Sequence, residues 1–388
     1  MEKSPILITC PKSIPPYLKQ EILSLGFPVL YETVSAVETE GTLEDTLRLN
    51  LFIRTGHRVL FLIEEFNAES PEELYEHIHQ IEWEEYFHKE EYLCVTSSVD
   101  HPTIKDSRFA NLTCKDGIVD RFYNKSGQRP DSGPKRDRVV VHLYWHGKQC
   151  RLFLDTSGDP LSRRGYRKIP LEAPMQETLA AATILTTGWK GDGNFINPMC
   201  GSGTLAIEAA MIGLDRTPGL LRSNYGFMHL RGFNEFLWKK LRKEARAKVK
   251  KSIEGKIIAT DISPEAIDAS KKNAMTAGVD PFIEFKVCDF SEMLIPEGGG
   301  IVMLNPPYGE RMGEIGELER IYKGIGDFFK RKCQGYRGYL FTGNLNLAKK
   351  VGLRTKRKLS FYNGEIESRL LEYELYKGSK KNVSFPSS

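Results

Sequence analysis

Four consecutive residues have types and an order that suit chemistry on the exocyclic amine of a nucleobase: Asn305, Pro306, Pro307 and Tyr308. Such an amine is a poor nucleophile, because its lone pair is delocalised into the ring. The amide oxygen of Asn305 and the carbonyl of Pro306 could accept its N–H groups and turn the lone pair towards an electrophilic methyl group, while the prolines fix the backbone. Tyr308 could stack on a base drawn out of its helix or loop. We predict that these four residues are catalytic.

A glycine-containing turn earlier in the chain has the composition of a ligand-binding loop. Residues 197–204 read Asn-Pro-Met-Cys-Gly-Ser-Gly-Thr and lie between a predicted strand and a predicted helix. Glycine lets the backbone approach a ligand, and the helix N-terminus directs free N–H groups at it. The turn lacks the third glycine of the dinucleotide fingerprint, which disfavours a nicotinamide-dependent oxidoreductase. The residues that we expect to contact a cofactor here are Asn197, Pro198, Cys200, Gly201 and Gly203.

Acidic residues lie where the next two predicted strands end, in the pairs Asp261-Ile262 and Asp289-Phe290. The carboxyl ends of parallel strands share one edge of a sheet, and ligands bind at that edge. Asp261 is placed to hold ribose hydroxyls and Asp289 to accept from an adenine amino group. Each acid alone could be a helix cap or a turn residue, but three ligating features at successive strand ends favour a nucleoside-type cofactor.

These features require an α/β fold with a parallel, doubly wound sheet in the second half of the chain. From about residue 158, longer helical patterns alternate with apolar strands. The predicted strands are 194–197, 256–261, 282–287, 301–305 and 339–342, followed by a hairpin of 358–362 with 368–376. The first 66 residues alternate strand and helix signals as a small α/β sandwich, and a second small unit begins at Ser70-Pro71, a helix start.

Composition restricts the class of protein. Of 388 residues, 40% are hydrophobic, which is enough for sizeable cores and excludes fibrous and disordered proteins. No apolar run approaches the roughly 20 residues of a membrane span, and the N-terminus does not resemble a signal peptide. The seven cysteines form no C-x-x-C pair, and His142 and His146 would lie about 13 Å apart along a strand. We therefore expect a cytoplasmic protein with no metal site and no disulfide framework.

Charge is distributed unevenly along the chain. Residues 1–100 carry a net charge of −12, whereas residues 101–170 and 171–388 carry +8 each. The segment 212–251 has 11 Lys and Arg against 3 Asp and Glu. Two interpretations are compatible with each other: a helical insertion with a solvated basic face, and an RNA-facing surface with phosphate contacts and stacking. The aromatic residues interleaved with its charges are Tyr225, Phe227, Phe233, Phe236 and Trp238.

Several stretches together resemble the RlmL/YpsC family of RNA methyltransferases. The resemblance rests on residues 197–210 (Asn-Pro-Met-Cys-Gly-Ser-Gly-Thr-Leu-Ala-Ile-Glu-Ala-Ala) and on residues 305–311 (Asn-Pro-Pro-Tyr-Gly-Glu-Arg). Residues 115–122 resemble the THUMP signature, residues 154–167 the passage into the catalytic domain, and residues 173–182 the helix that flanks the cofactor. The similarity covers most of the chain from about residue 40 to residue 310.

The resemblance implies a class I enzyme that uses S-adenosyl-L-methionine to methylate guanosine N2 in large-subunit (23S) rRNA. It implies a ferredoxin-like domain (1–66), an RNA-binding THUMP domain (67–157, or from about 43) and a Rossmann-like methyltransferase domain (158–388) with the insertion 212–251. It also assigns Glu177 to the cofactor site. Asn197 departs from the family, which usually has Asp there. A neutral amide attracts the positively charged donor less, so we expect weaker cofactor binding.

Two alternatives keep part of this interpretation. The same tetrapeptide would also serve an adenine N6 amine, in RNA or in DNA, although no groove-binding motif for DNA is present. The chain could also be a non-catalytic RNA-binding factor of ribosome assembly. Replacing Asn305 by Ala distinguishes the methyltransferase hypotheses from the non-catalytic one. Only a methyltransferase would lose activity while its RNA binding is retained.

Overall fold

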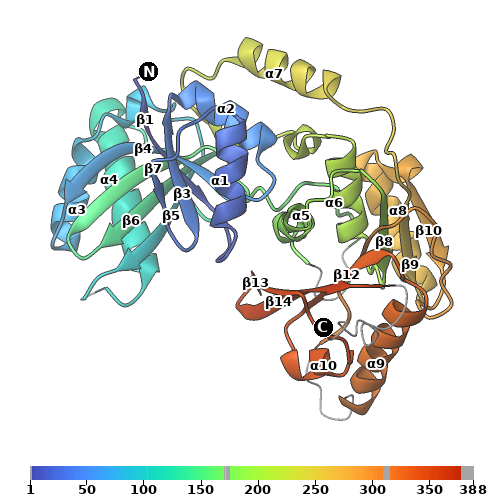
Figure 1. The fold of residues 1–388 in the computed structure, drawn as a ribbon. Coiled ribbons are helices and arrows are strands. Elements are labelled where there is room, and N and C mark those ends of the chain that lie inside the picture. Colours follow the sequence, from blue (N-terminus) through green and yellow to red (C-terminus); the bar gives the residue numbers. More distant parts are fainter. Residues whose placement is uncertain (1, 103, 170, 172–174, 309–314, 377–388) are drawn as a thin grey trace, which may run out of the picture. The chain divides into compact units, whose positions relative to one another are not determined.

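The computed structural model describes residues 2–102, 104–169, 171, 175–308 and 315–376. Parts of three stretches named above lie outside them: residues 309–311, residues 173–174 and the C-terminal residues 377–388. The chain folds into two compact units (Figure 1). The N-terminal unit comprises Met1–Arg164 and Thr217–Ala247, and the C-terminal unit comprises Gly165–Arg216 and Lys248–Ser388.

One seven-stranded sheet forms the centre of the N-terminal unit, with the order β2-β3-β1-β4-β7-β6-β5. Pairing is antiparallel except between β5 and β6. β4 pairs with β7, with Leu60 opposite Asp155, so the two modules expected at 1–66 and 67–157 share this sheet. The strands are β1 (Ser4–Thr9), β2 (Tyr31–Glu32), β3 (Ala36–Gly41), β4 (Arg58–Asn67), β5 (Leu93–Asp100), β6 (Val139–His146) and β7 (Gln149–Asp155).

The helices of this unit begin at the residues that the sequence marks as caps. Thr42 accepts from the backbone N–H of Asp45 and Asp45 accepts from that of Thr42, which completes a capping box. Ser70 caps the next helix through the N–H of Glu73. The four helices before residue 164 are α1 (Pro15–Ser24), α2 (Leu43–Phe52), α3 (Pro71–Gln80) and α4 (Ser107–Ser126).

The basic segment belongs largely to the N-terminal unit, although its sequence lies inside the range expected for the catalytic domain. It forms short 3₁₀ turns and then α7 (Glu235–Ala247). The rings of Tyr225 and Phe227 are stacked with their centroids 5.0 Å apart, and the Trp238 ring meets the Tyr225 ring edge-on with centroids 5.4 Å apart. All three are buried, so of the two interpretations the stacking on RNA bases does not apply to these rings, which form the core of the insertion. Phe236, in contrast, is 80% exposed.

The C-terminal unit has a second seven-stranded sheet, with the order β10-β9-β8-β11-β12-β14-β13. Its first five strands are parallel, while β14 is antiparallel to both of its neighbours. This confirms the predicted α/β fold. The strands are β8 (Asn194–Pro198), β9 (Ile257–Asp261), β10 (Ile283–Val287), β11 (Gly300–Leu304), β12 (Tyr336–Thr342), β13 (Arg357–Asn363) and β14 (Ile366–Glu374). Its helices are α5 (Glu177–Thr186), α6 (Thr204–Gly213), α8 (Pro264–Ala277), α9 (Ile315–Arg331) and α10 (Leu345–Lys349).

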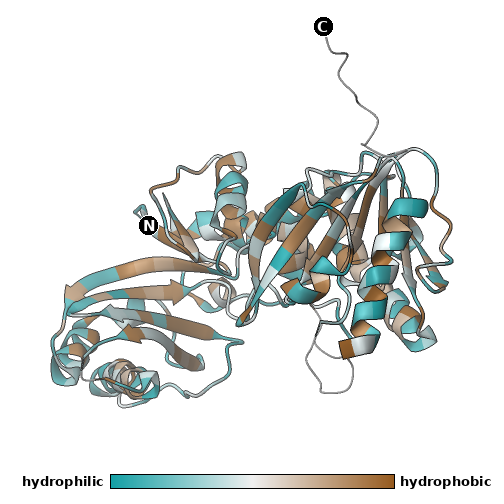
Figure 2. Ribbon diagram, turned by 60° about the horizontal axis from the view of Figure 1, so that its bottom comes forward, coloured by the Kyte–Doolittle hydropathy of each residue, from teal (hydrophilic) through white to brown (hydrophobic). Residues whose placement is uncertain are grey.

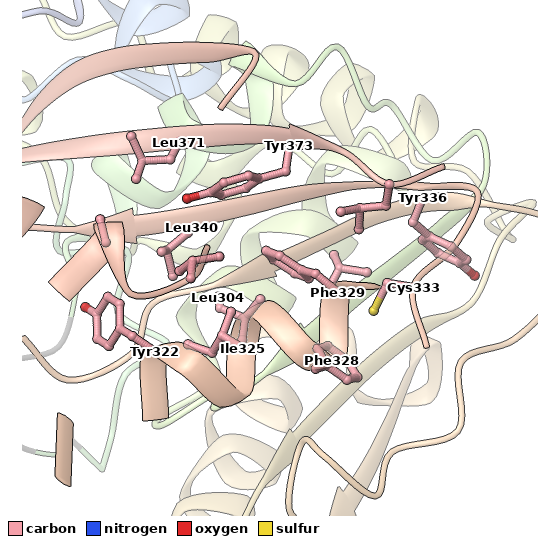
Figure 3. Packing of buried hydrophobic residues seen from close by; sticks show 14 of the residues in the cluster. Leu304, Tyr322, Ile325, Phe328, Phe329, Cys333, Tyr336, Leu340, Leu371 and Tyr373 are labelled. Carbon is pink, nitrogen blue, oxygen red and sulfur yellow. The ribbon is translucent and has the colours of Figure 1, made fainter. Parts of the chain in front are cut away.

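A large apolar cluster packs α9 against this sheet. Tyr322, Ile325 and Phe329 of α9 lie beside Leu340 of β12 and Tyr373 of β14 (Figure 3). In both units the strands contain much of the hydrophobic sequence, while the helices show bands of hydrophilic and hydrophobic residues (Figure 2). The central strands β8 and β11 are buried on both faces, which fixes where each of them ends and therefore where the residues that follow lie.

Candidate active site

The order of strands reverses between β8 and β11, which is where parallel α/β sheets bind ligands. β8 and β11 are direct neighbours, with Val302 opposite Ile196. β9 lies on the other side of β8, with Thr260 opposite Pro198. The structure therefore brings the glycine turn, Asp261 and the tetrapeptide that begins at Asn305 to the same edge of the sheet.

The glycine turn leaves β8 through a tight bend. Met199 has a positive φ of 54°, which is uncommon for a residue with a side chain. The N–H of Cys200 donates to the carbonyl of Thr260 at 2.9 Å, which ties the turn to β9. α6 then begins without a side-chain cap on its first turn, so N–H groups at its N-terminus point at the site.

The two glycines of the turn have different roles. Gly201 has a φ of +53°, and a Cβ atom there would meet nothing within 4 Å. Gly203 has a φ of +84°, and its Cβ would lie 2.9 Å from Oγ of Ser270. The open space at Gly201 lets a ligand approach the backbone, whereas Gly203 permits close packing of the turn on α8.

Asp261 holds the turn and the start of α8 at once. Its Oδ2 accepts from the N–H of Gly201 at 3.0 Å, and its Oδ1 accepts from the N–H of Ser263 at 3.0 Å. Each carboxylate oxygen can accept a further hydrogen bond, so the group can also hold hydroxyls of a ligand. Ile262, the next residue, is 71% exposed and is available to cover a ligand with apolar surface.

Asp289 and Phe290 follow β10, as the sequence predicts. Oδ1 of Asp289 accepts from the N–H of Ser291 at 2.7 Å, so this acid is a turn residue with acceptor capacity left over. The ring of Phe290 meets that of Phe328 edge-on at 5.7 Å. This contact anchors the loop after β10 to α9.

Glu177 is buried at the first turn of α5 and pairs with Nη2 of Arg167 at 3.5 Å. The same nitrogen of Arg167 donates to Oγ1 of Thr204, at the start of α6, at 3.0 Å. Glu177 is thus linked to the glycine turn through Arg167.

Three residues that support the turn were not predicted as site residues: Arg167, Ser270 and Asn273. Ser270 donates to the carbonyl of Gly201 at 2.7 Å, and Asn273 donates to that of Ser202 at 3.1 Å. Both lie on α8, three residues apart, and are buried. The sequence signal that could have identified Ser270 and Asn273 is their helical spacing on a face of α8 that is otherwise apolar.

The tetrapeptide follows β11 directly. Pro306 is buried, Pro307 is exposed, and Asn305 and Tyr308 are half-buried. Oδ1 of Asn305 is a buried atom with no hydrogen-bond partner among the described residues. The hydroxyl of Tyr308 accepts from Nδ2 of Asn363 at 3.0 Å. An acceptor buried without a donor carries a desolvation cost, which a ligand N–H would relieve.

Electrostatics exclude one further chemistry. Burial raises the pKa of the Cys200 thiol to about 12, so the thiol is protonated near neutral pH and is not a nucleophile. Within the described ranges, no three metal-binding side chains cluster together, and no helix there is long and apolar enough to cross a membrane. The arrangement can bind a ligand along β8 and β9 and present acceptors to a second molecule at β11.

Comparisons with known families divide the chain into three matches. Residues 5–60 match the RlmL ferredoxin-like domain, residues 68–155 match the THUMP domain, and residues 164–372 match the RMKL-like methyltransferase domain. All three agree with the resemblance found in the sequence.

Similar proteins extend these matches over nearly the whole chain. The ribosomal RNA large subunit methyltransferase K/L of Syntrophotalea carbinolica is 38% identical over 95% of this chain and 53% of its own length. The chain thus spans about half the length of such relatives. A Synechocystis protein, slr0064, provisionally named an RNA methyltransferase, is 32% identical over 96% of this chain and 97% of its own. The crystal structure of SMU.472, provisionally named a methyltransferase and complexed with SAH, is 27% identical, covers 98% and 100% of the two chains, and gives a TM-score of 0.87.

Proposed function

The chain belongs to the RMKL-like methyltransferase family, and we propose that it transfers a methyl group from S-adenosylmethionine to the exocyclic N2 amine of a guanosine in 23S rRNA. One observation carries the proposal. The unpartnered amide oxygen of Asn305 lies at the same sheet edge as the open glycine turn and Asp261. A donor of methyl groups and an acceptor for amine N–H groups would therefore meet there.

The residues present fit S-adenosylmethionine. Gly201 leaves space for close approach of a ligand to the backbone, and α6 offers N–H groups to it. Asp261 would hold the ribose hydroxyls, and Asp289 with Phe290 would hold the adenine. Asn197, whose buried Oδ1 lacks a partner among the described residues, would face the charged end of the cofactor. The remaining contacts would come from Pro198, Cys200, Ile262 and, through Arg167, Glu177.

When bound, the cofactor supplies an electrophilic methyl group on a positively charged sulfur. The protein's own contribution is orientation rather than acid–base chemistry. Oδ1 of Asn305 would accept one N–H of the target amine and the carbonyl of Pro306 the other, which turns the nitrogen lone pair towards the methyl group. Pro306 and Pro307 have no N–H to compete for these acceptors and keep the carbonyl aimed. Tyr308 would stack on the target base.

The N-terminal unit supplies the means to hold RNA. It contains the THUMP match and the exposed basic residues of α7. We propose domain limits of 1–66, 67–157 and 158–388, with the insertion 212–251 serving the N-terminal unit. A substrate in ribosomal RNA places the enzyme in the cytoplasm.

Transfer of a labelled methyl group to unmodified 23S rRNA tests the proposal, together with calorimetric titration of S-adenosylmethionine. We expect Asn305→Ala to lower the transfer rate by about 100-fold or more, because one preorganised transition-state contact is lost. Its affinity for the cofactor should stay within twofold of wild type. Pro307→Ala, at an exposed neighbouring side chain, should cost only about tenfold. Full activity of Asn305→Ala would overturn the proposal.

A further inference from the structure

A cavity of about 330 Å³ opens where β12 ends, in the C-terminal unit. Its lining comes from the turn after β12, the start of α10 and the first half of β14: Gly343, Asn344, Leu345, Asn346, Glu367 and Arg369. None of these residues has a role in the site described above. The size is at the lower end for ligand pockets and suits a single base or nucleoside better than a larger molecule.

The cavity adjoins the tetrapeptide through Gly343. A Cβ atom at Gly343 would lie 2.9 Å from Cε2 and 3.0 Å from Cδ2 of Tyr308, so the ring rests directly on this glycine. Asn363, which donates to the Tyr308 hydroxyl, lies at the end of β13, in the same hairpin that supplies Glu367 and Arg369. Gly343 therefore lies between the cavity, which it lines, and the ring of Tyr308.

The chemistry of the lining suits a nucleobase. Nη2 of Arg369 donates to Oε1 of Glu367 at 2.6 Å, so a guanidinium and a carboxylate stand side by side. Together with the exposed amide of Asn346 they offer donors and acceptors to the edge of a base, and the exposed side chain of Leu345 offers apolar surface to its face. Because the positive charge of Arg369 is already paired with Glu367, the lining attracts a phosphate group less than a free guanidinium would, which favours a base as the occupant.

We propose that this cavity binds the base of a nucleotide directly adjacent to the target in the RNA strand. The proposal rests on the proposed function, in which the tetrapeptide takes the target base. A target drawn out of its helix or loop loses its stacking partners, and holding its neighbour keeps the strand in register at the site. The cavity thus contributes to the choice of nucleotide, while Asn305 and Pro306 handle the amine.

A cycle that combines protein variants with altered RNA tests this assignment. The substrate is an RNA fragment that wild-type protein methylates, together with versions in which the nucleotide on either side of the target lacks its base. We expect one abasic version to raise KM about tenfold for wild type, and Arg369→Gln to raise KM about tenfold on intact RNA. The two changes together should raise KM no more than either change alone, because they remove the same contact. The rate at saturation and the affinity for S-adenosylmethionine should stay within twofold.

Two further variants sharpen the result. Arg331→Gln, which removes an equal charge from the exposed end of α9, should leave KM unchanged and serves as the control. Glu367→Gln should raise KM if a base is bound, and lower it if the occupant is a phosphate. The inference is wrong if Arg369→Gln and the missing base multiply their effects on KM at both flanking positions. It is also wrong if Glu367→Gln lowers KM. If wild-type protein methylates no fragment of the RNA at all, the proposed function itself is refuted.

Discussion

The side-chain amide of Asn197 donates a hydrogen bond of 3.0 Å to the main-chain carbonyl of Met303. This contact joins the end of β8 to β11, the two strands between which the sheet order reverses. The donor is the amide N–H of Asn197, and an ionised aspartate has no such group, so aspartate here would leave the carbonyl without this partner. Asn197 therefore links the two strands that carry the site, but it lacks the negative charge with which an aspartate would attract the sulfonium of the cofactor.

Asn197→Asp should change stability and cofactor preference in opposite directions. Loss of the bond to Met303 should lower the free energy of unfolding by about 1–2 kcal/mol. The new negative charge should favour positively charged S-adenosylmethionine over neutral S-adenosylhomocysteine by several-fold. Urea unfolding and calorimetric titration with both ligands measure these effects. Equal changes in the affinity for the two ligands would show that Asn197 does not face the sulfonium.

Alanine substitutions at the two glycines of the turn should have different effects, mainly on cofactor affinity at Gly201 and mainly on stability at Gly203. Gly201→Ala places a methyl group in open space at a φ of +53°, so it should cost about 1–2 kcal/mol of stability and weaken S-adenosylmethionine at least tenfold. Gly203→Ala brings Cβ to 2.9 Å from Ser270 and should destabilise the protein by about 3 kcal/mol. Thermal unfolding and calorimetry of both variants provide the comparison. Wild-type affinity of Gly201→Ala for the cofactor would show that the ligand does not approach the backbone at this glycine.

The exposed cations of α7 should contribute to RNA affinity through phosphate contacts. Lys240, Lys243 and Arg246 are exposed along this helix, on a unit whose first 100 residues carry a net charge of −12. Replacing all three by Gln should reduce the slope of log affinity against log salt by about 2 to 3. Fluorescence anisotropy with labelled rRNA fragments at several salt concentrations measures this slope.

The matched control for α7 removes Lys3, Lys12 and Lys19, three lysines of the N-terminal module. It loses the same charge at a different place. If both triple variants shift the slope equally, only overall charge matters, and α7 is not a specific RNA contact.

The ends of two central strands in the C-terminal sheet could be predicted from the sequence. The strands β9 and β11 lie within one residue of their predicted limits, because parallel strands buried on both faces are uninterrupted apolar runs. Asp261, the last residue of β9, and Asn305, the residue after β11, therefore lie at the expected edge. The roles of Ser270 and Asn273 were not predicted, since a buried polar residue on a helix does not reveal which backbone it contacts.

The basic segment shows the limit of composition as evidence. Tyr225 and Trp238 alternate with cations in the sequence, a pattern that fits a stacking surface and a packed insertion equally well. Burial decides between them, and burial depends on residues far away in sequence: Gly226 packs against the backbone of Asp155 and Gly158. The pairing of β4 with β7 is similarly a long-range contact that no local pattern contains.

His142 should make the N-terminal unit less stable in acid. Burial, with repulsion from Arg58 and Arg136, lowers its pKa to about 4. The unfolded chain takes up the proton near pH 6.5, so stability falls as the pH drops from about 6.5 to about 4. Urea unfolding across this range should show a shallower decline for His142→Asn than for wild type. Parallel curves would exclude a contribution from this histidine.

Nucleoside mass spectrometry can detect methyl transfer to a guanine N2 amine, on unmodified large-subunit rRNA incubated with the protein and S-adenosylmethionine. We expect new N2-methylguanosine with wild-type protein and none above background with Asn305→Ala. New N6-methyladenosine, or no methylated nucleoside from a protein that binds the cofactor, would show that the proposed reaction is wrong.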